Sequence, residues 1–109
     1  MGRQALRDDR TDRKNGCMSA PPTRLRLWIH GRVQGVFFRD SVRRTATERG
    51  VSGWAENLPD GSVEVVIEGE PDAVRAVADY CRQGPRHAHV DHVDEQQTPA
   101  EGLRGFEIR

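Results

Sequence analysis

The segment Gly31–Arg39, which reads GRVQGVFFR, is the part of the chain best suited to chemistry on an anion. Its two glycines let the backbone turn tightly and approach a ligand, so successive amide groups can converge on one point. The segment leads into a helical pattern, whose N-terminus adds the positive end of its dipole. Arg39 places a guanidinium beside the same point. A cation is unfavourable there unless a negative ligand or a nearby carboxylate offsets it, so the spacing predicts an anion-binding loop.

The same loop also fits a plainer interpretation. Two glycines before a helix are common in ordinary turns, and the residue types alone do not separate a turn from a phosphate site. The loop is not a Walker loop, because no Gly-Lys-Ser/Thr follows it, and it has two of the three glycines of a dinucleotide-binding fingerprint. Both interpretations therefore stay open at this point.

Three histidines near the C-terminal end are the other candidates for chemistry. His87, His89 and His92 fall in one strand-like run, but on a regular strand His92 points away from the other two. No cysteine or carboxylate at ligand spacing completes the set, so we expect a solvated polar strand and no metal site. His30, which adjoins the loop, is expected to be an exposed histidine at a strand end.

Hydrophobic periodicity indicates the elements that would position these residues. Residues 24–30 alternate between apolar and polar, which is typical of a half-buried strand, and a helical pattern follows from Phe38 to Arg49. Runs 51–58 and 62–68 flank a Pro-Asp-Gly turn and predict a β-hairpin. A second helix is predicted from Pro71 to Arg82, with a stripe of four apolar residues: Val74, Val77, Ala78 and Cys81.

The last part of the chain predicts two more strands. Residues 88–96 form the weaker one, in which Val90 and Val93 have opposite parity, so a bulge or a change of face is needed if both are buried. Phe106 and Ile108 supply a short final strand. The order is βαββαβ plus a terminal strand, which predicts an α+β, ferredoxin-like split βαβ fold: an antiparallel sheet with both helices on one face.

The chain divides into a tail and one domain. Residues 1–23 are rich in Arg, Asp, Gly, Pro and Thr without hydrophobic periodicity, which predicts a disordered N-terminal tail. Met18 is an alternative start to Met1, because every patterned segment lies after residue 22. Residues 24–109 suffice for one domain with a modest core.

Composition limits the partners that the protein can have. The 17 Lys and Arg balance 17 Asp and Glu, so no overall field draws the chain to nucleic acid or to a membrane. No apolar run reaches the ~18 residues of a spanning helix, and the N-terminus lacks the apolar core of a signal peptide. We expect a cytoplasmic monomer in which Cys17 and Cys81 are free thiols.

Two long motifs carry a family resemblance. GRVQGVFFR followed by GWAENLPDGSVEVVIEG resembles the two signature blocks of the acylphosphatase family, and the likeness extends over about residues 24–109. Members are small ferredoxin-like enzymes that cleave carboxyl–phosphate anhydrides to a carboxylate and inorganic phosphate, without metal, cofactor or covalent intermediate. One departure is Ala55, where the family usually has a β-branched residue; it affects packing more than chemistry.

The resemblance implies a role for each residue of the site. Arg39 matches the phosphate-binding arginine, and Asn57 matches the asparagine that holds the attacking water. The substrates would be small acyl phosphates. The phosphoryl oxygens would be bound by the backbone amides of a six-residue loop: Val33, Gln34, Gly35, Val36, Phe37 and Phe38.

Two other functions are weighed against this one. RNA-binding modules share the topology and stack bases on sheet aromatics, for which Trp28 and Trp54 are candidates. Glu64 and Glu68 would lie on the surface that an RNA needs, so we expect no nucleic acid partner. Acylphosphatase-like domains also occur within larger carbamoyl-transfer maturation proteins, and the absence of a following domain favours a free-standing enzyme.

Overall fold

The computed structural model describes residues 21–109, so most of the predicted tail, with Cys17 and Met18, lies outside the described part. Its elements follow the predicted order closely. They are β1 (Thr23–Arg32), α1 (Phe38–Glu48), β2 (Ser52–Asn57), β3 (Val63–Gly69), α2 (Pro71–Gln83), β4 (His89–Thr98) and β5 (Phe106–Ile108).

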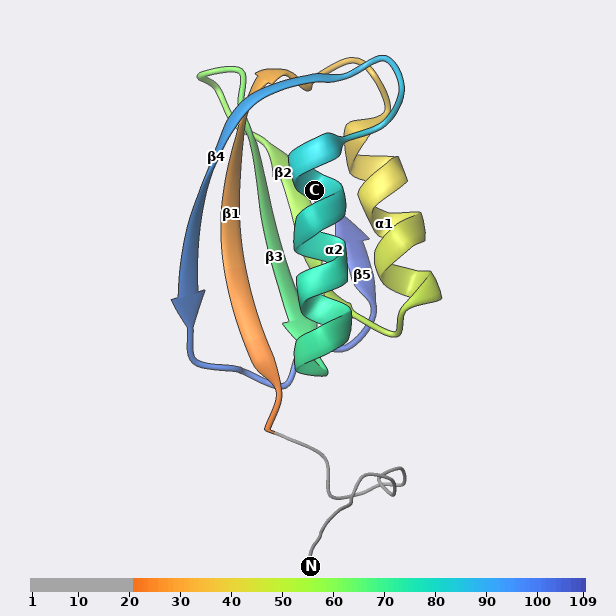
Figure 1. The fold of residues 1–109 in the computed structure, drawn as a ribbon, viewed down its shortest axis with the longest axis vertical. Helices are drawn as coiled ribbons and strands as arrows, with labels where there is room; N and C mark the ends of the chain where they lie inside the picture. Colours follow the sequence, from red (N-terminus) through yellow and green to blue (C-terminus); the bar gives the residue numbers. More distant parts are fainter. Residues whose placement is uncertain (1–20) are drawn as a thin grey trace, which may run out of the picture.

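One five-stranded sheet organises the molecule, in the order β4-β1-β3-β2-β5. Strands β4, β1, β3 and β2 pair antiparallel, as predicted, whereas the short β5 pairs parallel to β2 and makes the sheet mixed. Both helices cover the same face of the sheet, α2 over the centre and α1 beside it (Figure 1). The predicted α+β arrangement is therefore confirmed, with a parallel strand added at one edge.

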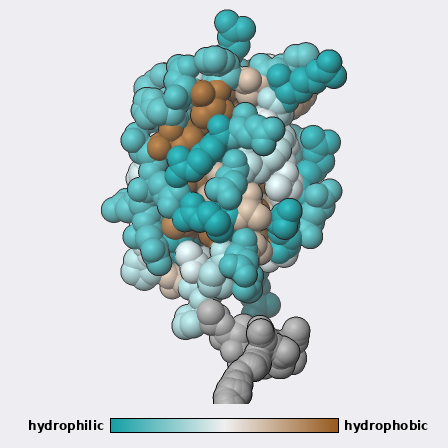
Figure 2. Space-filling model, viewed as in Figure 1, coloured by the Kyte–Doolittle hydropathy of each residue, from teal (hydrophilic) through white to brown (hydrophobic). Residues whose placement is uncertain are grey.

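The core lies between the helices and the inner face of the sheet. Alternate residues of β1 point into it, and the predicted apolar stripe of α2 is fully buried. Burial raises the pKa of the Cys81 thiol to about 12, because the thiolate would lose its hydration, so Cys81 is a packing residue. The surface on the side of the helices is largely hydrophilic, with small hydrophobic areas exposed among the hydrophilic side chains (Figure 2).

Strand β4 contains the bulge that its sequence required. Ile29 pairs with Val93, and Gly31 pairs with Val90. Between these two pairs β1 has one residue, whereas β4 has two. Asp91 is that extra residue. The bulge changes the parity of the strand and lets both valines pack against the core, which confirms the prediction.

On the outer face of the sheet, Glu68 of β3 holds the C-terminal segment of the chain in place. Its buried carboxylate accepts hydrogen bonds from the backbone N–H groups of residues 101, 102 and 103, at 2.7–3.0 Å. Burial disfavours the charged form of Glu68, but these three N–H groups and the charge of Arg24 outweigh it and lower the pKa. The segment that leads into β5 is thereby held against the sheet.

No helix in the described part of the chain is long and apolar enough to cross a lipid bilayer.

Candidate active site

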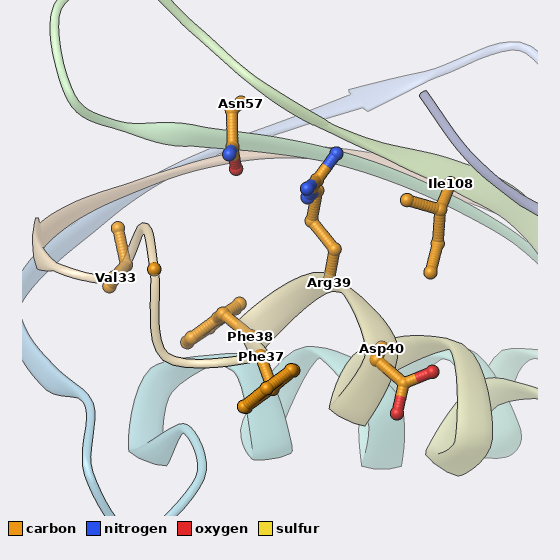
Figure 3. Close-up of a pocket in the computed structure, with 8 residues that line it drawn as sticks. Val33, Phe37, Phe38, Arg39, Asp40, Asn57 and Ile108 are labelled. Atoms are coloured by element: carbon orange, nitrogen blue, oxygen red, sulfur yellow. The ribbon is translucent and has the colours of Figure 1, made fainter.

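A cavity of about 230 Å³ lies where the β1–α1 loop, the start of α1 and the ends of β2 and β5 meet. Figure 3 shows the side chains of Arg39, Asn57 and Ile108 pointing into the space between these segments, whereas those of Phe37 and Asp40 point away from it. The lining residues are Val33, Gly35, Phe37, Phe38, Arg39, Asp40, Asn57 and Ile108. Elements that are far apart in the sequence therefore build one site.

The loop is anchored at its start by close packing. Gly31 has a φ of 133°, and a Cβ at this position would lie 2.1 Å from the carbonyl oxygen of His89, so only glycine fits beside β4. The side chain of Val33 is buried in the core. The first turn of the loop therefore has a fixed position relative to the sheet.

Gln34 ties the loop to the β2–β3 hairpin. Its Nε2 group donates to the carbonyl oxygens of Leu58, at 2.7 Å, and Ser62, at 2.9 Å. Leu58 directly follows Asn57, so this pair of hydrogen bonds sets the distance between the loop and the end of β2. The family resemblance implied a role only for the backbone amide of Gln34. Its side chain could not be assigned a partner from the sequence, because the two carbonyl acceptors lie 24 and 28 residues further along the chain.

Two adjacent phenylalanines have opposite surroundings at the start of α1. Phe38 is 1% exposed and anchors the helix in the core, whereas Phe37 is 83% exposed at the edge of the cavity. Phe37 has a φ of 59°, in the left-handed region that residues with a Cβ rarely adopt. Such strain is often found where a backbone is held for binding.

The N-terminus of α1 has no side-chain cap. The first hydrogen bond of the helix runs from the N–H of Ser41 to the carbonyl oxygen of Phe37. The N–H groups of Phe38, Arg39 and Asp40 precede it and have no partner within the helix. They form the kind of donor group that binds phosphate at helix N-termini.

Arg39 projects from this first turn toward the sheet, and its guanidinium faces the same space as the amide of Asn57 (Figure 3). Its Nη1 group donates to the main-chain oxygen of Arg109 at 2.5 Å. Asp40, the adjacent carboxylate, pairs instead with Arg43 and, at 3.7 Å, with Arg44. Within residues 21–109, no Asp or Glu side chain lies within ion-pair distance of Arg39, whose hydrogen bond in this region goes to the main chain of Arg109.

Asn57 is the last residue of β2 and pairs with Val63 of β3. It belongs to the side of the strand that faces the helices, and its amide points into the cavity (Figure 3). The turn that follows is rigid, because the Asp60 carboxylate accepts hydrogen bonds from both the side chain and the backbone of Ser62, which lowers the pKa of Asp60.

The structure brings most of the sequence-derived site residues together. The exceptions are Gln34 and Val36, which do not line the cavity. Ile108 also lines the cavity, which the sequence did not predict. The pattern of a short C-terminal strand does not show which strand it pairs with, and the position of Ile108 depends on the pairing of β5 with β2.

The three histidines weighed as metal ligands do not form a set. His92 instead groups with His30 and Asp94 on the outer face of the sheet, the one such group of three within residues 21–109. Of the partners of His92, His30 lies across the strand pair on β1 and Asp94 lies two residues further along β4; His87 and His89 are not among them.

Comparison with known proteins gives a consistent result. The acylphosphatase family model matches residues 25–108. A protein named acylphosphatase from Rubrobacter xylanophilus is 54% identical over 99 residues, which are 89% of this chain and 90% of the relative. Another of that name, from Thermococcus kodakarensis, is 51% identical over 78% of this chain and 93% of its own length.

Solved structures show the same likeness in three dimensions. The structure of an acylphosphatase from Coxiella burnetii superimposes with a TM-score of 0.77 at 38% identity, covering 81% of this chain and 93% of that one. Full-length HypF in its phosphate- and nucleotide-bound form matches with a TM-score of 0.75 at 22% identity, over 82% of this chain and only 12% of its own. The likeness to HypF is one of fold.

Proposed function

The chain belongs to the acylphosphatase family, whose enzymes hydrolyse acyl phosphates, and we propose that Arg39, Asn57 and the amides of residues 33–38 perform this hydrolysis without a metal ion. The observation that carries the proposal is the meeting of Arg39, Asn57 and the uncapped N-terminus of α1 in one cavity. These groups supply positive charge, hydrogen-bond donors and a polar amide at a single point.

The phosphoryl group would bind at the start of α1. Its oxygens would accept hydrogen bonds from the free backbone N–H groups and from the guanidinium of Arg39, which suits phosphate because its donors form a planar fork. Phosphoryl transfer depends mainly on positioning and on stabilising charge on the equatorial oxygens. A fixed set of donors provides both.

Asn57 would orient the attacking water. The water oxygen forms a bond to phosphorus while the bond from phosphorus to the acyl oxygen breaks, and the carboxylate leaves with the bonding electrons. The proton of the water passes to a phosphoryl oxygen of the substrate, since the cavity offers no histidine and its one carboxylate, Asp40, is paired with arginines. A carboxylate leaving group needs no strong general acid.

The donor set supports catalysis without a metal ion. The lining residues include one carboxylate, Asp40, which is already paired with Arg43 and Arg44, and no histidine or cysteine, so they offer no unpaired ligand for Mg²⁺ or Zn²⁺. Arg39 would occupy the role that a cation has in other phosphoryl-transfer sites. We therefore expect full activity in the presence of a chelator.

The acyl group would contact an apolar rim. Phe37 and Ile108, the latter 38% exposed, are the two exposed large hydrophobic side chains within the described residues, and both line the cavity. The remaining mouth is open to solvent, so the site would select weakly among acyl groups.

Phosphate release from benzoyl phosphate, with EDTA present, tests the proposal. We expect the Arg39→Ala and Asn57→Ala variants to lose about 100-fold or more in kcat/KM, as for the loss of a donor to transition-state charge. Arg49→Ala, an exposed arginine at the C-terminal end of α1 that does not line the cavity, is the matched control and should keep its activity. Retention of full activity by either site variant, or loss of wild-type activity in EDTA that Mg²⁺ restores, would contradict the proposal.

We also expect the protein to act on small molecules rather than on RNA. The ring of Trp28 is covered by the guanidinium of Arg26 at 5.0 Å, and that of Trp54 by Arg109 at 4.3 Å. Both rings are thus engaged by side chains of the chain itself, and Glu64 and Glu68 lie on the same face. A filter-binding assay with single-stranded RNA at low salt should detect no retention.

A further inference from the structure

Two histidines and one aspartate meet on the outer face of the sheet, on the side opposite the helices. His30 of β1 and His92 of β4 are direct partners in the antiparallel register, and Asp94 follows two residues after His92 on the same face. One ligand atom of each lies within 4.8 Å of the other two. None of the three lines the cavity, so the cluster is separate from the proposed active site.

We propose that His30, His92 and Asp94 form a surface site for a divalent transition-metal ion of the zinc type. Two imidazole nitrogens and one carboxylate oxygen are a donor set that Zn²⁺, Ni²⁺ and Cu²⁺ favour, whereas Mg²⁺ and Ca²⁺ prefer oxygen alone. Water molecules would complete the coordination on the solvent side, because all three side chains reach the surface.

The distances between the donors are close to those of a metal site. The Nε2 atom of His30 lies 3.2 Å from Oδ2 of Asp94, and the Nε2 atom of His92 lies 3.8 Å from the same oxygen. Ligands about 2.1 Å from a tetrahedral metal are about 3.4 Å from one another. Adjustments of a few tenths of an ångström bring each imidazole nitrogen to this distance from the carboxylate oxygen, and the two nitrogens, which lie within 4.8 Å of each other, must move closer together.

The strands hold the two imidazoles together before any ion binds. The rings stack with their centroids 4.3 Å apart and their planes 9° from parallel, and both Nε2 atoms point toward Asp94. Coordination requires the rings to tilt so that the two lone pairs converge, which rotation about the soft χ2 angle of histidine allows. The backbone need not move.

A metal ion at this site would join β1 to β4 beside the Asp91 bulge. His30 also directly precedes Gly31, where the loop of the cavity begins. Because the cluster forms only when the two strands pair, the ion would bind the folded chain and raise its unfolding midpoint. The ion would have no part in hydrolysis.

Calorimetric titration of the tag-free full chain with ZnCl₂ tests the site. A Cys17→Ser background removes a thiol that could bind Zn²⁺ elsewhere. We expect one saturable site, and at least a tenfold loss of affinity in His92→Ala and in Asp94→Asn. His89→Ala is the matched control and should bind as the parent does, because His89 also lies near an aspartate, at 3.1 Å from Asp91, on the same strand.

Histidine side-chain NMR identifies the ligands independently. On addition of Zn²⁺, the imidazole signals of His30 and His92 should shift, while those of His87 and His89 stay in place. Phosphate release by His92→Ala should equal that of the parent. Binding weaker than about 1 mM, equal affinity in parent and ligand variants, or shifts confined to His87 and His89 would each overturn the proposal.

Discussion

The two helices of this protein begin in opposite ways. At α2, the Glu70 carboxylate accepts a hydrogen bond from the N–H of Ala73 at 3.2 Å, and Asp72 adds negative charge to the first turn. At α1, the capping position is held by Phe37 in a left-handed conformation with no side-chain hydrogen bond. Arg39 stands at the position in α1 that corresponds to Asp72 in α2.

The difference separates a helix start that its own chain caps from one that, in the proposed function, binds the phosphoryl group. α2 satisfies its first N–H groups and its dipole with residues of its own chain. α1 leaves its first N–H groups without a side-chain cap and places a cation, Arg39, beside Asp40, the acidic residue of its first turn, whose carboxylate is paired with Arg43 and Arg44. The start of α1 departs from the local rules of helix formation, as is expected of a helix start that serves as a binding site.

The largest effect is expected from exchanging these charges. Arg39→Asp should lower kcat/KM by at least about 100-fold and change the free energy of unfolding by less than about 1 kcal/mol. Asp72→Arg should leave kcat/KM unchanged and destabilise the fold by about 0.3–1 kcal/mol. Phosphate release and urea denaturation measure the two quantities. Equal loss of activity in both variants would remove the distinction between the helices.

Phe37 tests whether α1 begins under strain. Phe37→Gly and Phe37→Ala both remove the ring, but only glycine adopts a φ of 59° without a steric penalty. We expect the glycine variant to be more stable than the alanine variant by about 1 kcal/mol in urea denaturation. Equal stability of the two would mean that the left-handed conformation carries no strain.

Glu70 tests the other helix. Glu70→Ala removes the hydrogen bond to the N–H of Ala73, and we expect a loss of about 0.5–1 kcal/mol in the free energy of unfolding. Its kcat/KM should equal that of the parent, since α2 does not reach the cavity. Glu70→Gln, which keeps an acceptor, should recover most of the stability.

The smallest effect is expected at the ion pairs between α2 and β4, in which Arg75 and Arg82 bind Glu95. Hydrogen bonds from Arg75 and Arg82, together with their charges, hold the pKa of Glu95 below its usual 4.5 despite partial burial. Since the pKa is lower in the folded state, this contribution is present above about pH 4.5 and is lost as the pH falls through the lowered pKa.

Glu95→Gln should therefore cost a few tenths of a kcal/mol near pH 7. The difference from the parent should shrink as the pH falls below 4.5, the usual pKa of a glutamate. Thermal unfolding of the parent and the variant between pH 3 and pH 7 measures both the stability difference near pH 7 and its decrease at lower pH. A difference that is constant with pH would show that ionisation of Glu95 contributes nothing.

Most elements of the fold were predictable because periodicity is a local property. The buried stripe of α2 and the alternation of β1 appear directly in the residue order, and the opposite parity of Val90 and Val93 required the bulge that β4 contains. The parallel pairing of β5 with β2 was not predictable, since three residues carry too little pattern to specify a partner.

The sequence by itself determined the family and the βαββαβ order, and it predicted Arg39 and Asn57 as site residues, because these depend on residue types within short segments. Only the tertiary structure decided which distant groups meet. Gln34 reaches Leu58 and Ser62, Arg39 reaches the main chain of a residue 70 positions away, and His30 meets His92 and Asp94 across a strand pair. Such contacts depend on strand order and register, which the burial of the whole core sets and no short segment encodes.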